Sequence, residues 1–234
     1  MKRPIFTALT ILFSMSLFAQ EKIDVGINFN YGIPLGNQYF GTSTAETNPS
    51  MYLGNGTGGS IEGNYWFSER FSAGLEAGYL MFAEYDNVID EQIVKSSASA
   101  VPIVAKATVY LSSGRVKPYL ELGAGYMLMN HKQTAAIDLG TEVITQELTW
   151  DQSGPVISPR FGFQFVISKM IAINLNGQYN YAFNKIDGTH SFTLKTTGLD
   201  DVTMDVENAL SDATQFVTVN LGVKIALFDY FDVF

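Results

Sequence analysis

The chain has 234 residues, of which 47% are hydrophobic and 16% charged, with no cysteine and a formal net charge of −9. The lack of cysteine excludes a disulfide scaffold and a lipid anchor on a cysteine. The acidic balance disfavours nucleic acid as a partner, because its phosphates attract basic proteins.

The first residues have the layout of a secretory signal peptide. Lys2 and Arg3 precede an apolar run that ends at Phe18, and the small residue Ala19 follows. The apolar run is too short for a convincing membrane-spanning helix. We therefore predict a cleaved signal peptide at 1–20, with an uncleaved anchor helix as the alternative.

Residues 21–234 contain eight stretches in which apolar and polar residues alternate, a period of two that is typical of β-strands. The apolar sets, at every second residue, run over Ile23–Ile33, Thr57–Phe67, Phe71–Ala83, Val101–Leu111, Leu120–Leu128, Ile157–Ile167, Ile171–Phe183 and, within Phe216–Phe228, Val217–Leu227. These 49 positions hold no charged residue. The interleaved positions carry charges, amides and glycines.

An apolar outside and a polar inside are typical of a transmembrane barrel, whereas a soluble barrel has the opposite polarity. We therefore predict an all-β fold, an eight-stranded antiparallel up-and-down transmembrane β-barrel over 21–234. A soluble ligand-binding barrel of lipocalin type is the alternative.

The connections between these stretches alternate in length. Three are short, at 68–70, 112–116 and 168–170, and four are long, at 35–56, 86–95, 131–154 and 185–213. Outer-membrane barrels have tight periplasmic turns and long outer loops. The long connections hold 14 of the 23 acidic residues. We expect them to form an acidic extracellular rim that meets outer-membrane lipid, lipopolysaccharide or a surface partner.

Six charged residues share the inward side of the strands; five lie at similar heights above the tight turns, and Arg160 lies a little higher, next to the strand of Glu121. They are Glu62, Glu76, Lys106, Glu121, Arg160 and Lys224. An eight-stranded barrel is only wide enough inside for side chains, and buried charges need partners. We predict an ion-pair network that joins opposite walls, with a proton or ion path as the alternative. Asp24 and Glu84 fall on the same inward side.

Two segments resemble a known family. The run Pro118–Tyr126 reads PYLELGAGY, and Gly58–Tyr79 is a strand, a tight turn and a second strand. Both resemble the outer-membrane β-barrel domain family, which groups opacity-type adhesins with OmpX- and OmpA-type eight-stranded barrels and includes many "porin family" proteins of Bacteroidetes. The resemblance covers 21–228 and implies residence in the cell outer membrane. Phe228 or Phe234 would then be the terminal aromatic residue that the assembly machinery reads.

Catalytic patterns are weak. His131 and His190 are the two histidines, both in predicted outer loops. The neighbours His190 and Ser191 lack a third, orienting group. We predict no cofactor, no metal site and no enzyme activity. The expected function is that of an outer-membrane barrel with a plugged polar interior, in a structural or surface-interaction role. A small pore and a barrel enzyme acting on lipid are the alternatives.

Overall fold

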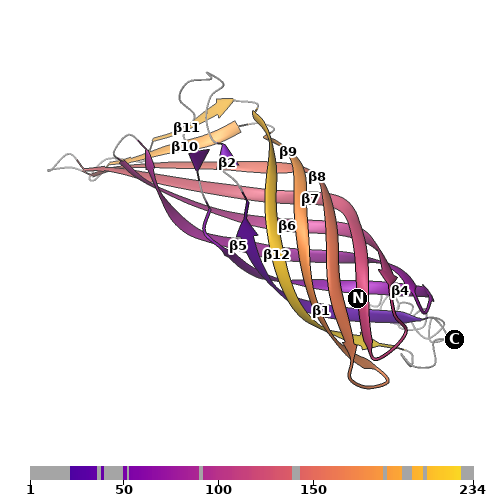
Figure 1. The fold of residues 1–234 in the computed structure, drawn as a ribbon. Coiled ribbons are helices and arrows are strands. Elements are labelled where there is room, and N and C mark those ends of the chain that lie inside the picture. The colour runs from indigo at the N-terminus through magenta and orange to yellow at the C-terminus, as the bar shows by residue number, and fades with distance from the viewer. Residues whose placement is uncertain are drawn as a thin grey trace, which may run out of the picture.

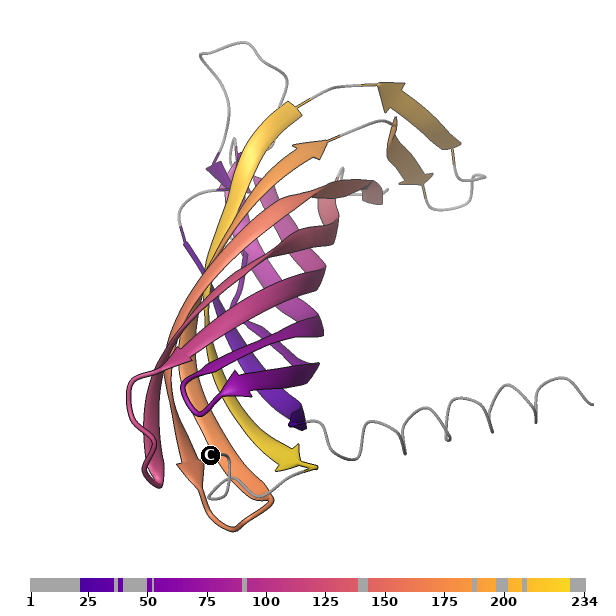
Figure 2. The ribbon, with the colours of Figure 1, turned by 90° about the vertical axis from the view of Figure 1, so that its right-hand side faces the viewer.

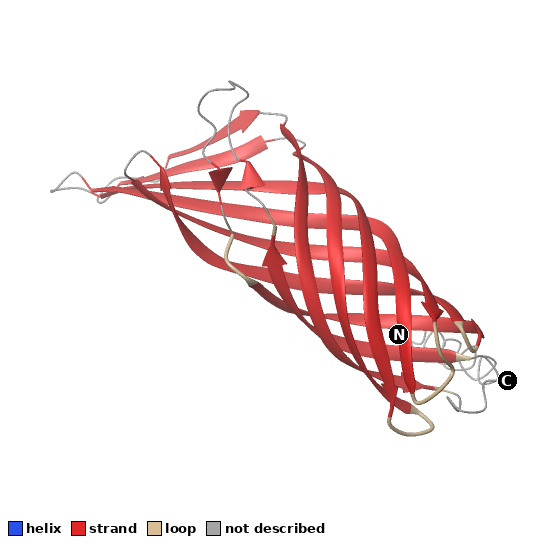
Figure 3. Cartoon of the chain, viewed as in Figure 1, coloured by secondary structure: helices blue, strands red, loops and turns tan. Residues whose placement is uncertain are grey.

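The computed structural model describes residues 22–35, 38–39, 50–51, 53–89, 92–138, 143–186, 189–196, 202–207 and 210–227. In these ranges every regular element is a strand (Figure 3). The strands are β1 (Ile23–Pro34), β2 (Gln38–Tyr39), β3 (Ser50–Met51), β4 (Gly56–Ser68), β5 (Phe71–Ile89), β6 (Gln92–Tyr110), β7 (Val116–Asp138), β8 (Val143–Val166), β9 (Ile171–Ile186), β10 (Thr189–Thr196), β11 (Val202–Glu207) and β12 (Leu210–Ala226).

Among the described residues, no helix is both long enough and apolar enough to cross a membrane.

Eight of the strands close into a barrel, as predicted. Their order around the wall is β8-β7-β6-β5-β4-β1-β12-β9, and β9 pairs back with β8. Every pairing is antiparallel. Figure 1 shows the tilted strands that this closure requires. The first and last strands meet side by side, with Asp24 opposite Ala226.

The two faces of the wall have the predicted polarity. Ile27, Ile61 and Leu75 point outward with 64–70% of their surface exposed, whereas Lys106 and Lys224 are buried inside. Because adjacent residues of a strand point to opposite faces, a regular strand can bury its charges and expose its apolar side chains at the same time. The exposed side chains form an apolar belt around the barrel, the surface that a bilayer's hydrocarbon would cover.

The strands extend further than predicted at one end of the barrel. The ranges 86–95, 131–154 and 185–213, which we assigned to long connections, are largely strand where the structure describes them. In two of them the sequence already contains strand-like runs, at Glu142–Leu148 and Phe192–Thr197, which predict projecting hairpins. The partners Ile89↔Gln92 and Asp138↔Val143 lie at the tips of two such hairpins. Backbone ladders continue there although the apolar–polar alternation stops, because cross-strand hydrogen bonds do not require it.

The hairpin of β10 and β11 lies on the extended part of β8. Thr193 of β10 faces Glu147 of β8 and Thr203 of β11. Figure 2 shows this hairpin projecting away from the barrel at the end opposite the tight turns. The long connections therefore add sheet to the barrel rather than only irregular loop.

Two irregularities alter the wall. The β8–β9 ladder lacks partners at Pro155 and Pro159, where proline has no N–H to donate. The β5–β6 register shifts between Phe82 and Tyr85. Glu84, which strict alternation places inside, is consequently exposed on the outside, so that expectation was wrong.

Candidate functional site

The barrel interior is built in three layers. The layer near the tight turns is apolar and aromatic, and its members are Trp66, Tyr110, Tyr119, Val166, Ala172 and Ala226. The layer toward the projecting hairpins is also apolar, and includes Leu80, Phe82, Met127, Met129, Val156 and Phe216. The charged side chains lie between the two.

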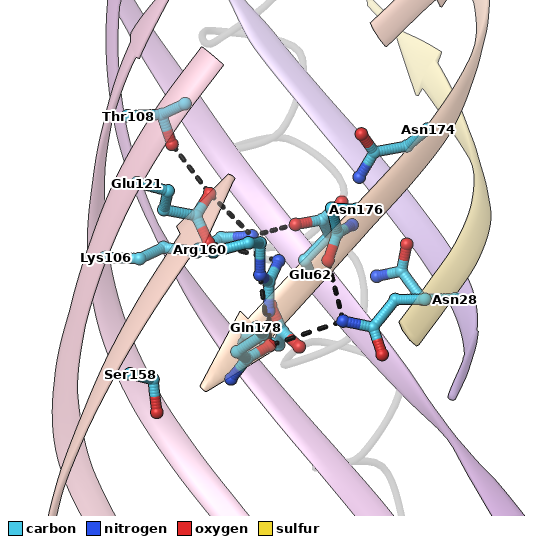
Figure 4. A network of polar contacts seen from close by, with 12 residues as sticks. Asn28, Glu62, Lys106, Thr108, Glu121, Ser158, Arg160, Asn174, Asn176 and Gln178 are labelled. Carbon is cyan, nitrogen blue, oxygen red and sulfur yellow. Dashed lines mark hydrogen bonds and ion pairs between the residues drawn. The ribbon is translucent and has the colours of Figure 1, made fainter. Parts of the chain in front are cut away.

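Lys106 of β6 lies at the centre of the charged layer (Figure 4). Its ammonium pairs with Glu62 of β4, with Glu76 of β5 at 3.2 Å and with Glu121 of β7 at 3.7 Å. Its side chain is only 1% exposed. One cation therefore contacts three carboxylates that reach it from three strands.

Arg160 of β8 and Lys224 of β12 complete the layer. Arg160 lies 2.8 Å from Glu76 and 3.1 Å from Glu121, and Lys224 lies 3.2 Å from Glu62. The three cations thus match three carboxylates. The Arg160–Glu76 pair joins strands that stand three places apart around the wall. The structure brings together all six charged residues that the sequence singled out.

Polar side chains hold the ends of this network. Thr108 donates a hydrogen bond to Glu121 at 2.7 Å, and Arg160 donates through its Nε to Gln178 of β9 at 3.0 Å. Asn220 donates to Asn176 at 2.7 Å. The sequence reasoning did not assign Thr108 or Gln178 a role, although their inward phase and height are the signals that would have found them.

A second polar group closes the end with the tight turns. Asp24 accepts hydrogen bonds from Asn64 at 2.7 Å and from the Trp66 indole at 2.6 Å. The Trp66 ring stacks on Tyr110 at 4.5 Å, and the Lys117 ammonium lies 5.2 Å from its centroid. Stacking and the cation–π contact hold a large ring across this end of the interior.

His131 lies at the opposite end, beyond the membrane-spanning part. On β7 the outward side chains become polar from Asn130 onward, so the wall at His131 projects from the belt. The imidazole is 1% exposed, and burial lowers the pKa of His131 to about 4, opposed by a hydrogen bond with Gln152. The side chain of His190 lies outside the described residues.

Aromatic side chains mark both edges of the apolar belt. Tyr65, Phe67 and Phe71 are exposed near a tight turn, and the Phe67 ring centroid lies 4.9 Å from that of Tyr65 and 5.4 Å from that of Phe71. Tyr79, Tyr126 and Phe183 are exposed toward the other edge. Such girdles lie at headgroup depth in barrels that cross a membrane.

Within the described ranges, no three histidine, cysteine or acidic side chains are grouped as metal ligands would be. Asp187, Asp200 and Asp201, which we assigned to the predicted acidic rim, lie outside the described residues.

No protein-family model matches the chain, and no curated protein sequence matches it. Solved structures do. One is the outer membrane protease OmpT of Escherichia coli, with 9% identity, a TM-score of 0.51, and coverage of 88% of this chain and 96% of OmpT. Another is a major outer membrane protein from Thermus thermophilus, with 11% identity, a TM-score of 0.50, and coverage of 86% and 99%. A third is AlkL, with 16% identity, a TM-score of 0.49, and coverage of 89% and 90%.

At these identities the likeness concerns the fold, which is that of an outer-membrane β-barrel. The fold implied by the sequence resemblance is therefore confirmed. The link to Bacteroidetes and the signal peptide at 1–20 remain predictions.

Proposed function

We propose that the protein resides in the outer membrane as a closed, non-conducting barrel, and that its projecting hairpins form a surface for interaction with a partner or with lipopolysaccharide. The observation that carries the first part is the three-layer interior. Apolar side chains cluster on both sides of the charged layer, and within that layer three cations are paired with three carboxylates. The six charges then act as structural pairs, not as an ion path.

Planar bilayers test the closed state. The purified barrel should produce no reproducible channels. The variant Phe216→Gly removes a side chain from the apolar layer. If that layer is the barrier, this variant should conduct more current than the natural protein. Large, regular channels from the natural protein would instead favour the small pore.

The surface role is testable because the segment 187–209, which contains the β10–β11 hairpin, can be removed without breaking the pairing of the barrel strands β9 and β12. Ile186 of β9 and Leu210 of β12 are direct partners, so an Asn-Gly turn can replace 187–209. The shortened protein should keep the heat-modifiable migration of a folded barrel on SDS gels. Expressing cells should lose attachment to one another or to epithelial monolayers, and unchanged attachment would argue against this surface.

An enzyme role is not proposed. OmpT is named as a protease, so the fold is compatible with catalysis, but the described histidine of this chain, His131, is enclosed within the wall. Mass spectrometry of lipid A from cells with and without the protein tests the remaining alternative, action on lipid. A changed lipid A would contradict the proposal.

A further inference from the structure

The three tight turns of the barrel repeat one pattern at the end opposite the projecting hairpin (Figure 2). In each turn a serine follows the last outward apolar residue of one strand, and a basic residue directly precedes the next exposed apolar residue. The serine hydroxyl accepts a hydrogen bond from a backbone amide of its own turn, at 3.1–3.3 Å. This bond gives the turn a defined conformation. The serines are Ser68, Ser112 and Ser168, and the basic residues are Arg70, Arg115 and Lys169.

Backbone hydrogen bonds fix each turn to the adjacent strand. The Tyr110 amide donates to the Arg70 carbonyl, and the Val166 amide donates to the Arg115 carbonyl, both at 2.8 Å. The Ala226 amide donates to the carbonyl of Met170, next to Lys169, at the same distance. All three donors belong to the apolar and aromatic layer that fills this end of the interior. The three basic residues are therefore held at the level of that layer, where the wall of the barrel ends.

Each basic side chain lies at the edge of the apolar belt. Arg70, Arg115 and Lys169 are exposed. The apolar residues that follow them are exposed as well, with 39% for Phe71, 48% for Val116 and 49% for Met170. When hydrocarbon covers the belt, a long basic side chain beside it extends its charged end to the headgroups. We call Arg70, Arg115, Lys169 and these three apolar neighbours the tight-turn rim.

This end of the barrel carries a surplus of positive charge. Its described residues include five basic and two acidic side chains, a net charge of +3, and these are Lys22, Arg70, Arg115, Lys117 and Lys169 against Asp24 and Glu69. At the opposite end, the exposed lysines Lys95 and Lys132 each pair with a glutamate at 2.9 Å. The attraction of an anion to the rim comes from the net charge, so it does not require every cation to lack a partner.

We propose that the tight-turn rim binds anionic glycerophospholipids of the periplasmic leaflet. The lipid phosphates lie toward Arg70, Arg115 and Lys169, and the acyl chains follow the apolar neighbours into the belt. A zwitterionic headgroup carries an ammonium beside its phosphate, so the rim attracts it less. A soluble polyanion would leave the exposed apolar side chains in water, which favours a lipid as the occupant. The assignment rests on the proposed membrane location.

Native mass spectrometry of the detergent-purified protein tests the assignment. The probes are phosphatidylglycerol and phosphatidylethanolamine with identical acyl chains. We expect the phosphatidylglycerol adduct at a concentration about tenfold below that needed for phosphatidylethanolamine, because each basic residue beside an anionic headgroup adds to the attraction. The preference should decrease as the salt concentration rises, since salt screens exposed charges. Equal retention of the two lipids by the natural protein would overturn the proposal.

Matched variants show which end of the barrel selects the lipid. Combining Arg70→Gln, Arg115→Gln and Lys169→Gln should remove the preference. Lys95→Gln with Lys132→Gln, which removes the exposed cations of the opposite end, should retain it. Arg70→Lys with Arg115→Lys should retain it as well, because the charge is kept. Loss of the preference in all of these variants, or in none, would contradict the assignment to the rim.

Two parallel measurements separate the remaining outcomes. If the natural protein does not insert into liposomes, the membrane location fails; if it inserts without lipid preference, only the rim assignment fails. Cosedimentation with purified peptidoglycan tests the other polyanion on this side of the membrane. Peptidoglycan binding that the triple glutamine variant loses, with an unchanged lipid preference, would overturn the lipid assignment.

Discussion

Replacing Lys106 by methionine should be among the most damaging single changes in the barrel. The lysine contacts all three carboxylates of the charged layer, while Arg160 and Lys224 balance only two of them. One carboxylate is then left buried without a counter-charge. Breaking a buried pair in this way costs about 3–5 kcal/mol of unfolding free energy. Methionine keeps the apolar bulk of the side chain, so a cavity contributes little to this loss.

The measurement is urea-dependent unfolding of the barrel folded in lipid vesicles, followed by the fluorescence of its two tryptophans, Trp66 and Trp150, and by heat-modifiable migration. Lys95→Met removes the lysine of an exposed pair and serves as the control, with no expected change. A loss of less than about 1 kcal/mol in Lys106→Met would refute the argument, because that is the size of an exposed ion pair.

A double variant separates charge balance from general damage. Lys106→Met with Glu121→Gln leaves two complete pairs, Glu62–Lys224 at 3.2 Å and Glu76–Arg160 at 2.8 Å. The double variant should therefore be more stable than Lys106→Met alone, a coupling that a double-mutant cycle measures directly. If the two losses simply add, the carboxylate is not the cause.

Two further predictions concern the wall itself. Because burial lowers the pKa of His131 to about 4 against 6.5 for an unperturbed imidazole, the unfolded state binds more protons between these values, and unfolding free energy should fall by about 3 kcal/mol as pH drops from 6.5 to 4. Urea titrations across this range should show the slope in the natural protein and a reduced slope in His131→Gln. Separately, a Cβ on Gly125 would collide with the Ile103 carbonyl oxygen, whereas one on Gly177 meets nothing within 4 Å. Gly125→Ala should therefore cost about 1–3 kcal/mol of unfolding free energy, and Gly177→Ala should not. Equal urea midpoints in the two variants would contradict the close approach at Gly125.

The fold was predictable because the bilayer imposes one rule on every strand. An outward position such as Leu75 or Ile27 must be apolar, and the inward neighbour is free to be charged. Counting from the tight turns also predicted which charges share a height. That count brings Glu62 opposite Glu76, its direct partner in the ladder. It placed Arg160 a little higher than Glu121, whereas the two residues are direct partners.

The apolar inner layers were not predicted. Leu80, Phe82 and Met127 fall on the inward phase, where the outer-face rule says nothing about polarity. Inside a barrel, the choice between apolar and polar side chains depends on what lies across the lumen. Such contacts join residues far apart in sequence and are not visible in any single strand.

The full lengths of the strands, beyond the runs Glu142–Leu148 and Phe192–Thr197, and the direction of Glu84 were not predicted for a related reason. Beyond the belt, the outer face of the wall meets water and is no longer required to be apolar, so β5 to β8 continue without the apolar–polar alternation in their sequences. The register shift near Phe82 then reverses the side on which Glu84 lies. A one-residue irregularity inverts every inference from alternation that follows it.

A one-residue shift reverses the faces of a strand, and for this reason the charged layer has a second role: it helps to select the register of the strands. If β6 slipped by one residue against its neighbours, Lys106 would face hydrocarbon and Ala105 or Ala107 would face the three carboxylates. The apolar belt alone penalises this slip on the outside, and the unmatched carboxylates penalise it again on the inside. A slip of two residues preserves the faces but moves Lys106 to another height, away from Glu62 and Glu121. The belt is indifferent to that second error, so the ion pairs supply the discrimination that alternation cannot.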